Sequence, residues 1–166
     1  EEIKNELKKD PKRKIVVFSE FSDTVDYVHK KLVKDGIKAI KYTSKGSNLE
    51  TDRIVRENFD ASNDVQKDDY DVVVATDSLS EGWNLNRAGT VFNYDIPYNP
   101  TRVLQRVGRI NRIGQMLFDK IYIYNYFPSD IGEREVQRKT TSKFKKAIID
   151  AVLGEDTQAI TNEEEL

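Results

Sequence analysis

Residues 71–84 read DVVVATDSLSEGWN, and this stretch decides how the chain is expected to fold. Its first part, 71–76, is rich in β-branched residues, which is typical of a strand buried on both faces of a parallel sheet. Its second part changes at Asp77 to small polar residues, Gly82 and a tryptophan. Ligands of open parallel sheets gather where the strands end. This boundary therefore predicts a site as well as a strand.

Apolar runs of the same kind, separated by helical patterns, lie on both sides of this stretch. The predicted strands are 14–19, 37–42, 71–76, 90–94 and 121–127. The predicted helices are 22–35, capped by Ser22 or Asp23, then 49–59, 100–112 and about 132–152. Strands that alternate with such helices indicate βαβ units, with helices on both faces of the sheet. The predicted fold class is α/β, three-layered, with a mainly parallel central sheet.

The composition excludes several classes of protein. A chain of 166 residues with a net charge of −2 is not a generally basic nucleic-acid binder, so such a role needs a local patch. The absence of cysteine excludes a disulfide framework and thiolate metal sites, and fits a cytoplasmic protein. No apolar run approaches the roughly 18 residues of a membrane span, so we expect no membrane partner. The chain opens at Glu1 without Met, and we expect it to be part of a longer protein.

A second informative stretch, QRVGRINRIGQ, occupies residues 105–115 and contains no acid. On one continuous helix, residues three and four apart share a face. The predicted face carries Gln105, Arg109 and Arg112, and it is bordered by Arg102 and Arg106. Guanidinium groups keep their charge and fork onto phosphate oxygens, so this face suits a polyphosphate. A solvated basic face is the alternative.

The turn after residues 71–76 offers complementary groups. Thr76 has a hydroxyl and a backbone N–H for a phosphate oxygen, and Gly82 lets the backbone approach a ligand closely. Asn84 has an amide for a sugar hydroxyl or a neighbouring acid. A purely structural strand-to-turn role is the alternative, and for Trp83 we expect packing rather than stacking on a ligand.

The phosphate cradle of an ATPase is missing. The sequence holds no G-x-x-x-x-G-K-[ST] loop, and no Asp-Glu pair follows an apolar strand to hold magnesium. Arginines without a cradle make sense as half of a split site, where arginine fingers act on nucleotide held by another lobe. Such fingers contribute as much as about 10³ or more in rate.

The ordered segments resemble the second RecA-like lobe, the helicase C-terminal domain, of superfamily 2 helicases and translocases, and most closely that of bacterial Swi/Snf-type ATPases. IVVFSEFS at 15–22 resembles motif IV, and YTSKGS at 42–47 the segment after it. ATDSLSEGWN at 75–84 resembles motif V, and DIPYNP at 95–100 with the 105–115 stretch resembles motif VI. The resemblance covers about residues 14 to 152.

The resemblance implies a role for each matching residue. The catalytic arginine fingers, which reach the γ-phosphate, are Arg109 and Arg112. The residues implied to contact ATP are Gly82, Asn84 and Gln105. Those implied to grip the nucleic-acid backbone, without reading sequence, are Ser19, Thr43, Ser44 and Thr76. ATP and Mg²⁺ are expected to be held mainly by an N-terminal RecA-like lobe of the same polypeptide, with no metal ligand in this chain.

The resemblance also implies a domain plan. It assigns residues 1–13 to an N-terminal extension or linker and 14–130 to the RecA-like lobe. It assigns 131–153 to a C-terminal bracing helix, and 154–166 to an acidic linker or disordered tail. Glu81 stands where strand-separating RNA helicases carry Arg, which argues against that subgroup. Arg106 and Asn111 replace the Ala and His of eukaryotic remodellers, which argues against a nucleosome specialist.

The leading hypothesis is the second lobe of an ATP-driven translocase on double-stranded DNA, from the cytoplasm of a bacterium. The first alternative is a lobe of a strand-separating helicase on single-stranded DNA or RNA. The second is a non-catalytic module that binds nucleic acid or protein, and the third is a free-standing structural domain. On the leading hypothesis, the isolated chain has no ATPase activity.

Overall fold

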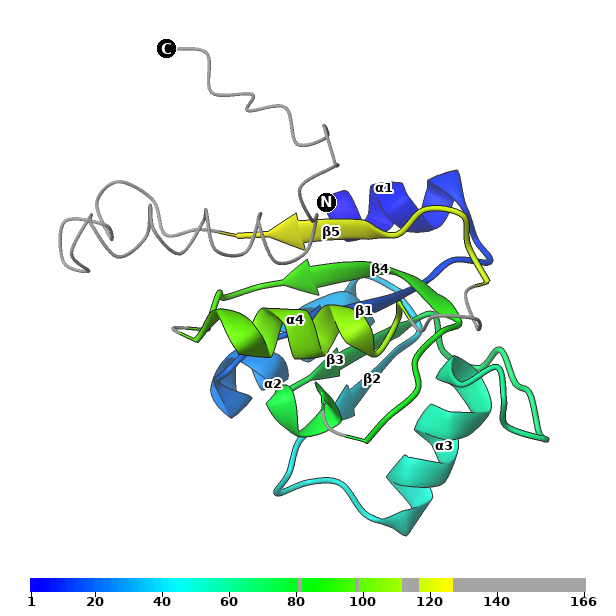
Figure 1. The fold of residues 1–166 in the computed structure, drawn as a ribbon, viewed down its shortest axis with the longest axis horizontal. Coiled ribbons are helices and arrows are strands. Elements are labelled where there is room, and N and C mark those ends of the chain that lie inside the picture. The colour runs from blue at the N-terminus through cyan, green and yellow to red at the C-terminus, as the bar shows by residue number, and fades with distance from the viewer. Residues whose placement is uncertain (81, 98, 112–116, 127–166) are drawn as a thin grey trace, which may run out of the picture. The chain divides into compact units, whose positions relative to one another are not determined.

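The computed structural model describes residues 1–80, 82–97, 99–111 and 117–126 (Figure 1). These residues belong to one compact unit, Glu1–Phe127. The strands are β1 (Lys14–Phe18), β2 (Ala39–Tyr42), β3 (Val72–Ala75), β4 (Ala88–Asn93) and β5 (Tyr122–Asn125). The helices are α1 (Glu2–Lys9), α2 (Ser22–Lys34), α3 (Leu49–Phe59) and α4 (Pro100–Gly108), with a 3-10 turn η1 (Asp77–Ser80). The predicted bracing helix and acidic tail lie outside the described residues.

The five strands form one parallel sheet in the order β2-β3-β1-β4-β5. All five predicted strands are present, with ends within about two residues of those expected. The α/β fold class is confirmed, because crossover helices connect parallel neighbours as βαβ units require. The carboxyl ends of β1, β3 and β4 therefore lie side by side at one edge of the sheet (Figure 1).

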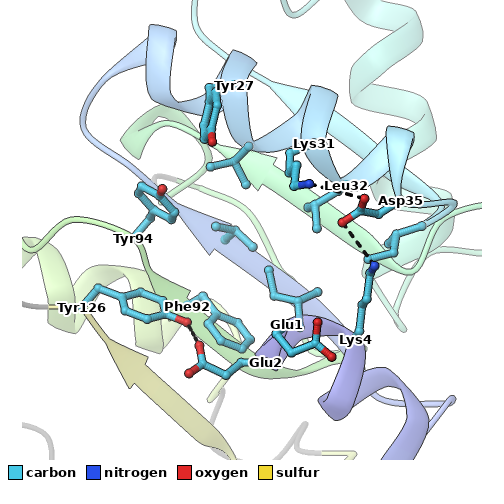
Figure 2. A pocket seen from close by; sticks show the side chains of 14 residues that line it. Glu1, Glu2, Lys4, Tyr27, Lys31, Leu32, Asp35, Phe92, Tyr94 and Tyr126 are labelled. Carbon is cyan, nitrogen blue, oxygen red and sulfur yellow. Dashed lines mark hydrogen bonds and ion pairs between the residues drawn. The ribbon is translucent and has the colours of Figure 1, made fainter.

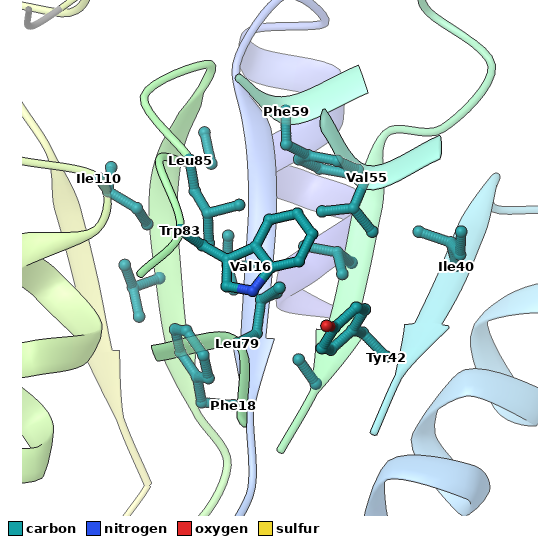
Figure 3. Packing of buried hydrophobic residues seen from close by; sticks show 14 residues of the cluster. Val16, Phe18, Ile40, Tyr42, Val55, Phe59, Leu79, Trp83, Leu85 and Ile110 are labelled. Carbon is teal, nitrogen blue, oxygen red and sulfur yellow. The ribbon is translucent and has the colours of Figure 1, made fainter. Parts of the chain in front are cut away.

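Alternate residues of β1 enter two separate cores, as the pleat of a strand dictates. Val16 and Phe18 pack with Val55 and Phe59 of α3 (Figure 3). The side chains of the other core come from β1, from α1 and α2, and from neighbouring strands; they include Ile15, Val17, Val25, Leu32, Ile3 and Leu7. Helices on both faces make the three predicted layers.

Two ends of helices differ from the sequence prediction. The predicted side-chain cap of α2 is wrong, because Phe21 occupies the N-cap position and makes no side-chain cap hydrogen bond. The predicted helix 100–112 is also wrong at its end, because α4 ends at Gly108 and Arg109 caps it. Bonds of the tighter i→i+3 type follow, from Arg109 N to Arg106 O and from Ile110 N to Val107 O. This turn places Ile110, which is only 2% exposed, in the core.

The first thirteen residues, expected to be an extension or linker, contain helix α1. Ile3 and Leu7 lie four residues apart, so they share the face that packs against the second core. None of the helices among the described residues is long and apolar enough to cross a membrane.

A small cavity of about 220 Å³ opens on this α1 and α2 face of the sheet (Figure 2). Tyr27, Tyr94 and Tyr126 stand at its rim, and Lys4 forms a 3.2 Å ion pair with Asp35 beside it. No residue predicted to bind ATP or nucleic acid lines this cavity. The candidate site therefore lies elsewhere, at the strand ends and on α4.

Candidate functional site

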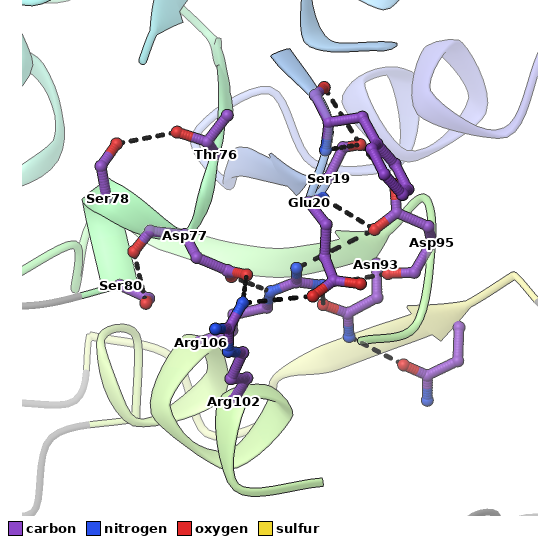
Figure 4. Close-up of polar contacts among 12 residues, drawn as sticks. Ser19, Glu20, Thr76, Asp77, Ser78, Ser80, Asn93, Asp95, Arg102 and Arg106 are labelled. Atoms are coloured by element: carbon purple, nitrogen blue, oxygen red, sulfur yellow. Dashed lines mark hydrogen bonds and ion pairs between the residues drawn. The ribbon is translucent and has the colours of Figure 1, made fainter. Parts of the chain in front are cut away.

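Arg106 occupies the centre of the site, beneath the ends of β3 and β4 (Figure 4). Its side chain is 0% exposed. Nε donates to Asp77 Oδ1 at 2.6 Å, while Nη1 donates to Asn93 Oδ1 at 3.1 Å and to the carbonyl of Asp95 at 3.0 Å. A buried charge needs such partners, because removing it from water is costly. The prediction that Arg106 borders an open cationic face is therefore wrong.

Asp95 connects this arginine to the end of β1. Its carboxylate accepts the hydroxyl of Ser19 through Oδ2, and the backbone N–H of Glu20 through Oδ1 at 2.8 Å. Ser19 is 1% exposed. The hydroxyl predicted to grip a nucleic-acid backbone is thus directed at a carboxylate (Figure 4). We refer to Ser19, Asp77, Asn93, Asp95 and Arg106 as the Arg106 network.

Arg102 is exposed, yet it is also paired with acids. Its Nη1 lies 3.2 Å from Glu20 Oε1 and 3.4 Å from Asp77 Oδ2. Two of the arginines of the predicted cationic face therefore share Asp77. The sequence analysis missed the acidic partners, Glu20, Asp77 and Asp95, because all of them come from segments outside 102–115. The one available signal was that each of these acids directly follows a predicted strand.

Arg109 differs from these two arginines. It is half-buried at the end of α4, and its Nε makes no hydrogen bond within the described part of the chain. Its carbonyl oxygen accepts the backbone N–H of Leu85 at 2.9 Å, which fixes the end of α4 against the 82–85 turn. Gln105 is exposed on α4. Arg109 keeps a helical backbone conformation at the C-cap, with φ −75° and ψ −25°, so it lies one turn beyond Gln105 as the predicted face requires. Arg112 lies outside the described residues.

The other residues predicted to contact nucleic acid follow β2 and β3, so the structure brings them to the same edge of the sheet. The Thr76 hydroxyl hydrogen-bonds Ser78 Oγ at 2.8 Å, and the Thr76 N–H donates to the carbonyl of Tyr42 at 3.1 Å. Thr43 is buried, whereas Ser44 is exposed. Ser44 therefore has the most accessible hydroxyl of the four.

The turn after η1 is built by Gly82 and Asn84. Gly82 is exposed with a φ of +73°, a left-handed conformation that favours glycine. Asn84 is 6% exposed, and its Nδ2 donates to Asp60 Oδ1 at 2.7 Å. Of the two partners foreseen for Asn84, the structure shows the neighbouring acid. Its Oδ1 has no hydrogen-bond partner among the described residues.

Trp83 packs inside the molecule, as predicted. It is buried with its ring 5.2 Å from that of Tyr42, in an edge-to-face arrangement (Figure 3). The guanidinium of Arg56 lies 4.4 Å from the indole ring. The tryptophan thus fixes the position of Gly82 and Asn84 against α3.

The described residues contain no group of three His, Cys, Asp or Glu side chains that could hold a metal ion. The carboxylates at the strand ends are instead satisfied by arginine and backbone N–H groups. Asp77 and Asp95 each face Arg106.

The helicase conserved C-terminal domain model matches residues 1–114 of this chain. The chain belongs to the helicase conserved C-terminal domain family. It is 29% identical over 148 residues to the uncharacterized ATP-dependent helicase YqhH of Bacillus subtilis (strain 168), which covers 89% of this chain and 24% of YqhH. It is 27% identical over 153 residues to the DNA repair protein RAD5 of Cryptococcus neoformans var. neoformans serotype D, which covers 92% of this chain and 12% of RAD5.

The fold also matches the crystal structure of the C-terminal part of the Fun30 ATPase domain. The TM-score is 0.65 at 20% identity, over 91% of this chain and 52% of that one. The resemblance to the second RecA-like lobe of superfamily 2 helicases, with Swi/Snf-like relatives, is thereby confirmed. The chain spans about a quarter or less of the length of the curated relatives named above.

Proposed function

We propose that this chain is the second motor lobe of an ATP-dependent, Swi/Snf-type translocase on double-stranded DNA. The observation that carries the proposal is the setting of Arg109. Its Nε has no hydrogen-bond partner among the described residues, while its backbone is fixed by Arg106 on one side and Leu85 on the other. A guanidinium on a fixed backbone, with no acid partner in the described part of the chain, suits a charge that develops on another molecule.

In this proposal Arg109 and Arg112 reach the γ-phosphate of ATP bound to an N-terminal lobe of the same polypeptide. Gly82, Asn84 and Gln105 lie on the nucleotide side of the cleft between the lobes. ATP binds there with Mg²⁺, which neutralises phosphate charge and is held by the N-terminal lobe. This chain contributes the fixed guanidinium groups, which in other enzymes are worth about 10³-fold or more in rate.

Nucleic acid is proposed to lie across the carboxyl ends of β1, β2 and β3. Ser44 and Thr76 provide hydroxyls there, with Thr43 and Ser19 beneath them. Hydroxyl and backbone N–H contacts to phosphate carry no sequence information, as a translocase requires. The similarity to a DNA repair protein supports DNA as the track. A bacterial, cytoplasmic setting is part of the same proposal.

The test is ATP turnover by the full-length parent, with and without double-stranded DNA. We expect stimulation by DNA, and its loss in both Arg109→Ala and Arg112→Ala. Lys34→Ala, an exposed cation of α2 on the opposite face of the sheet, is the matched control and should behave as wild type. If Arg109→Ala keeps full DNA-stimulated turnover, the finger assignment is wrong.

Two further outcomes separate the alternatives. Strand displacement on single-stranded DNA or RNA, without movement along a duplex, would support the strand-separating helicase. A parent that binds nucleic acid and never hydrolyses ATP would support the non-catalytic module. The isolated chain should show no turnover by itself, and measurable hydrolysis by it would contradict the split site.

A further inference from the structure

Ser19 has a conspicuous position for a residue expected to touch a phosphate. Its side chain is 1% exposed, and its hydroxyl donates to Asp95 Oδ2 while it accepts the N–H of Phe21 at 3.2 Å. Both hydrogen-bonding capacities of the hydroxyl are thus used inside the protein (Figure 4). Ser19 has little left to offer a ligand directly, so its role must pass through Asp95.

Asp95 connects the end of β1 to Arg106. Its carbonyl oxygen accepts Nη1 at 3.0 Å, and its Oδ1 lies 4.0 Å from Nη2. Nη2 is buried and makes no hydrogen bond among the described residues. A charge-assisted bond is about 2.7–2.9 Å long, so a shift of roughly 1 Å would close this contact. Nη2 is therefore an unused donor that faces the carboxylate of Asp95.

Asp77 connects the end of β3 to Arg106. It follows Thr76 directly, and the Thr76 side chain is bonded to Ser78 within the same turn. Asp77 accepts Nε of Arg106 at 2.6 Å. A ligand that moves the Thr76–Ser78 turn must therefore move the strongest contact of Arg106.

Arg106 in turn supports Arg109. The carbonyl oxygen of Arg106 accepts the N–H of Arg109 at 3.3 Å, in the turn that ends α4. The guanidinium of Arg106 is held by partners from the ends of β3 and β4, so its position depends on those strand ends. The half-buried Arg109 side chain projects from that same turn.

We propose that Ser19, Asp95 and Asp77 are positioning residues that act through Arg106 to place Arg109. Nucleic acid at the ends of β1 and β3 thereby sets the arginine finger for hydrolysis. This inference rests on the proposed function. It assigns Ser19 an indirect role in turnover instead of a contact with the phosphate backbone.

The test uses the full-length parent and the variants Ser19→Ala and Asp77→Asn. Ser19→Ala removes one oxygen and keeps every ion pair, so it tests the network without exposing a buried charge. In both variants we expect kcat at saturating double-stranded DNA to fall about fivefold or more, the range of ordinary coupling between sites. The KM for ATP, the DNA concentration for half-maximal stimulation and the salt dependence of DNA binding should stay within about twofold. Loss of a direct phosphate contact would instead weaken DNA binding and lower its salt slope.

Lys14→Met is the matched control. Lys14 is a second buried cation, at the opposite end of β1, where it donates to the carbonyl of Tyr70 at 2.6 Å. This variant should keep wild-type kcat even if it melts at a lower temperature. A fall in kcat equal to that of Ser19→Ala would show that the loss reflects general destabilisation.

The double variant Ser19→Ala/Asp77→Asn distinguishes a network from two separate effects. Within one network, the combined loss of kcat should be smaller than the product of the single losses. Multiplying losses, or wild-type kcat in both single variants, would overturn the inference. If DNA does not stimulate the wild-type parent, or if Arg109→Ala is fully active, the proposed function itself fails. These outcomes concern the wild type and Arg109, so they are distinguishable from a failure of the network, which appears only in the Ser19 and Asp77 variants.

Discussion

The backbone N–H of Leu85 donates to the carbonyl oxygen of Arg109 across 2.9 Å, and so joins the turn after η1 to the end of α4. Carbonyl groups at the end of a helix lack a partner within the helix. The N–H of Leu85, 24 residues earlier in the sequence, is the hydrogen-bond partner of the Arg109 carbonyl. Because of this bond, the Gly82 turn and the Arg109 side chain have a common support. A movement of the Gly82 turn therefore shifts the end of α4, and a movement of the end of α4 shifts the Gly82 turn.

Arg106 should be far more important for stability than Arg102, although both contact Asp77. Arg106→Met leaves Asp77, Asn93 and the Asp95 carbonyl without their buried donor, and should lower the free energy of unfolding by about 3–5 kcal/mol. Arg102→Met removes an exposed pair and should cost less than about 1 kcal/mol. Urea unfolding of the two variants measures the difference. Equal losses would show that the buried pairing is not what holds α4.

Asn84 provides a prediction with a defined pH dependence. Asn84→Ala removes the donor to Asp60 and should cost about 1–3 kcal/mol. Asn84→Asp places a second carboxylate beside Asp60, which raises the pKa of one of the two in the folded state. The folded protein then binds a proton that the unfolded chain releases, so stability falls as pH rises through that pKa.

Unfolding experiments at several pH values check this sign. Asn84→Asp should be less stable than Asn84→Ala at neutral pH, and the gap should narrow as the pH falls towards about 5. A gap that is constant with pH would mean that the new carboxylate turns away from Asp60. Asn63→Asp, in the loop that follows Asp60, is the control and should show no such narrowing.

The fold was predictable because its signals are local. A short apolar run with three consecutive valines, Val72–Ala75, identifies a buried strand without reference to the rest of the chain. Helix α3 begins after Asn48, whose side chain accepts the N–H of Thr51, and its bounds match the prediction. The end of α4 depended on distant partners instead. Ile110 packs in a core built by other segments, and the N–H of Leu85 donates to the carbonyl of Arg109.

The candidate site was predictable in its location and less so in its pairing. Strand order places Thr43 and Thr76 at one edge, as the parallel topology requires. The sequence alone shows five polar groups spaced as on one helix, and nothing in 102–115 reveals that two of the arginines face acids. Asp77 lies 29 residues from Arg106, so only the folded chain shows which guanidinium is paired and which Nε has no partner among the described residues.

Gly89 and Gly108 should respond in opposite ways to alanine. A Cβ at Gly89 would lie 2.6 Å from Arg13 Cγ and 2.9 Å from Phe118 Cδ2. Arg13 would have to move, with loss of its bond to the Gly89 carbonyl and its stacking on Phe118, at a cost of about 1–3 kcal/mol. A Cβ at Gly108 meets nothing within 4 Å, so Gly108→Ala should stabilise α4 by up to about 1 kcal/mol. Thermal unfolding of both variants measures the two effects, and destabilisation by Gly108→Ala would contradict the open space.

The ion pair between Asp35 and Lys4 should make the attachment of α1 dependent on pH. Its carboxylate bonds to Lys4 at 3.2 Å, and this contact, with Lys31 nearby, lowers the pKa of Asp35 below its ordinary value of 3.8. Because the folded-state pKa is the lower one, the stabilisation is complete above 3.8 and is lost as the pH falls through the folded value. Asp35→Asn should therefore lower the melting temperature near neutral pH and make less and less difference as the pH falls below 3.8, towards acid unfolding.

Melting curves between these limits test the assignment. Asp64→Asn, an exposed acid in the loop after α3, is the control and should not show this pH-dependent difference. Lys4→Met should reproduce the pH dependence of Asp35→Asn, because it removes the other half of the same pair. If Lys4→Met leaves the acid limb of the wild-type curve unchanged, Lys4 is not the cause of the lowered pKa of Asp35.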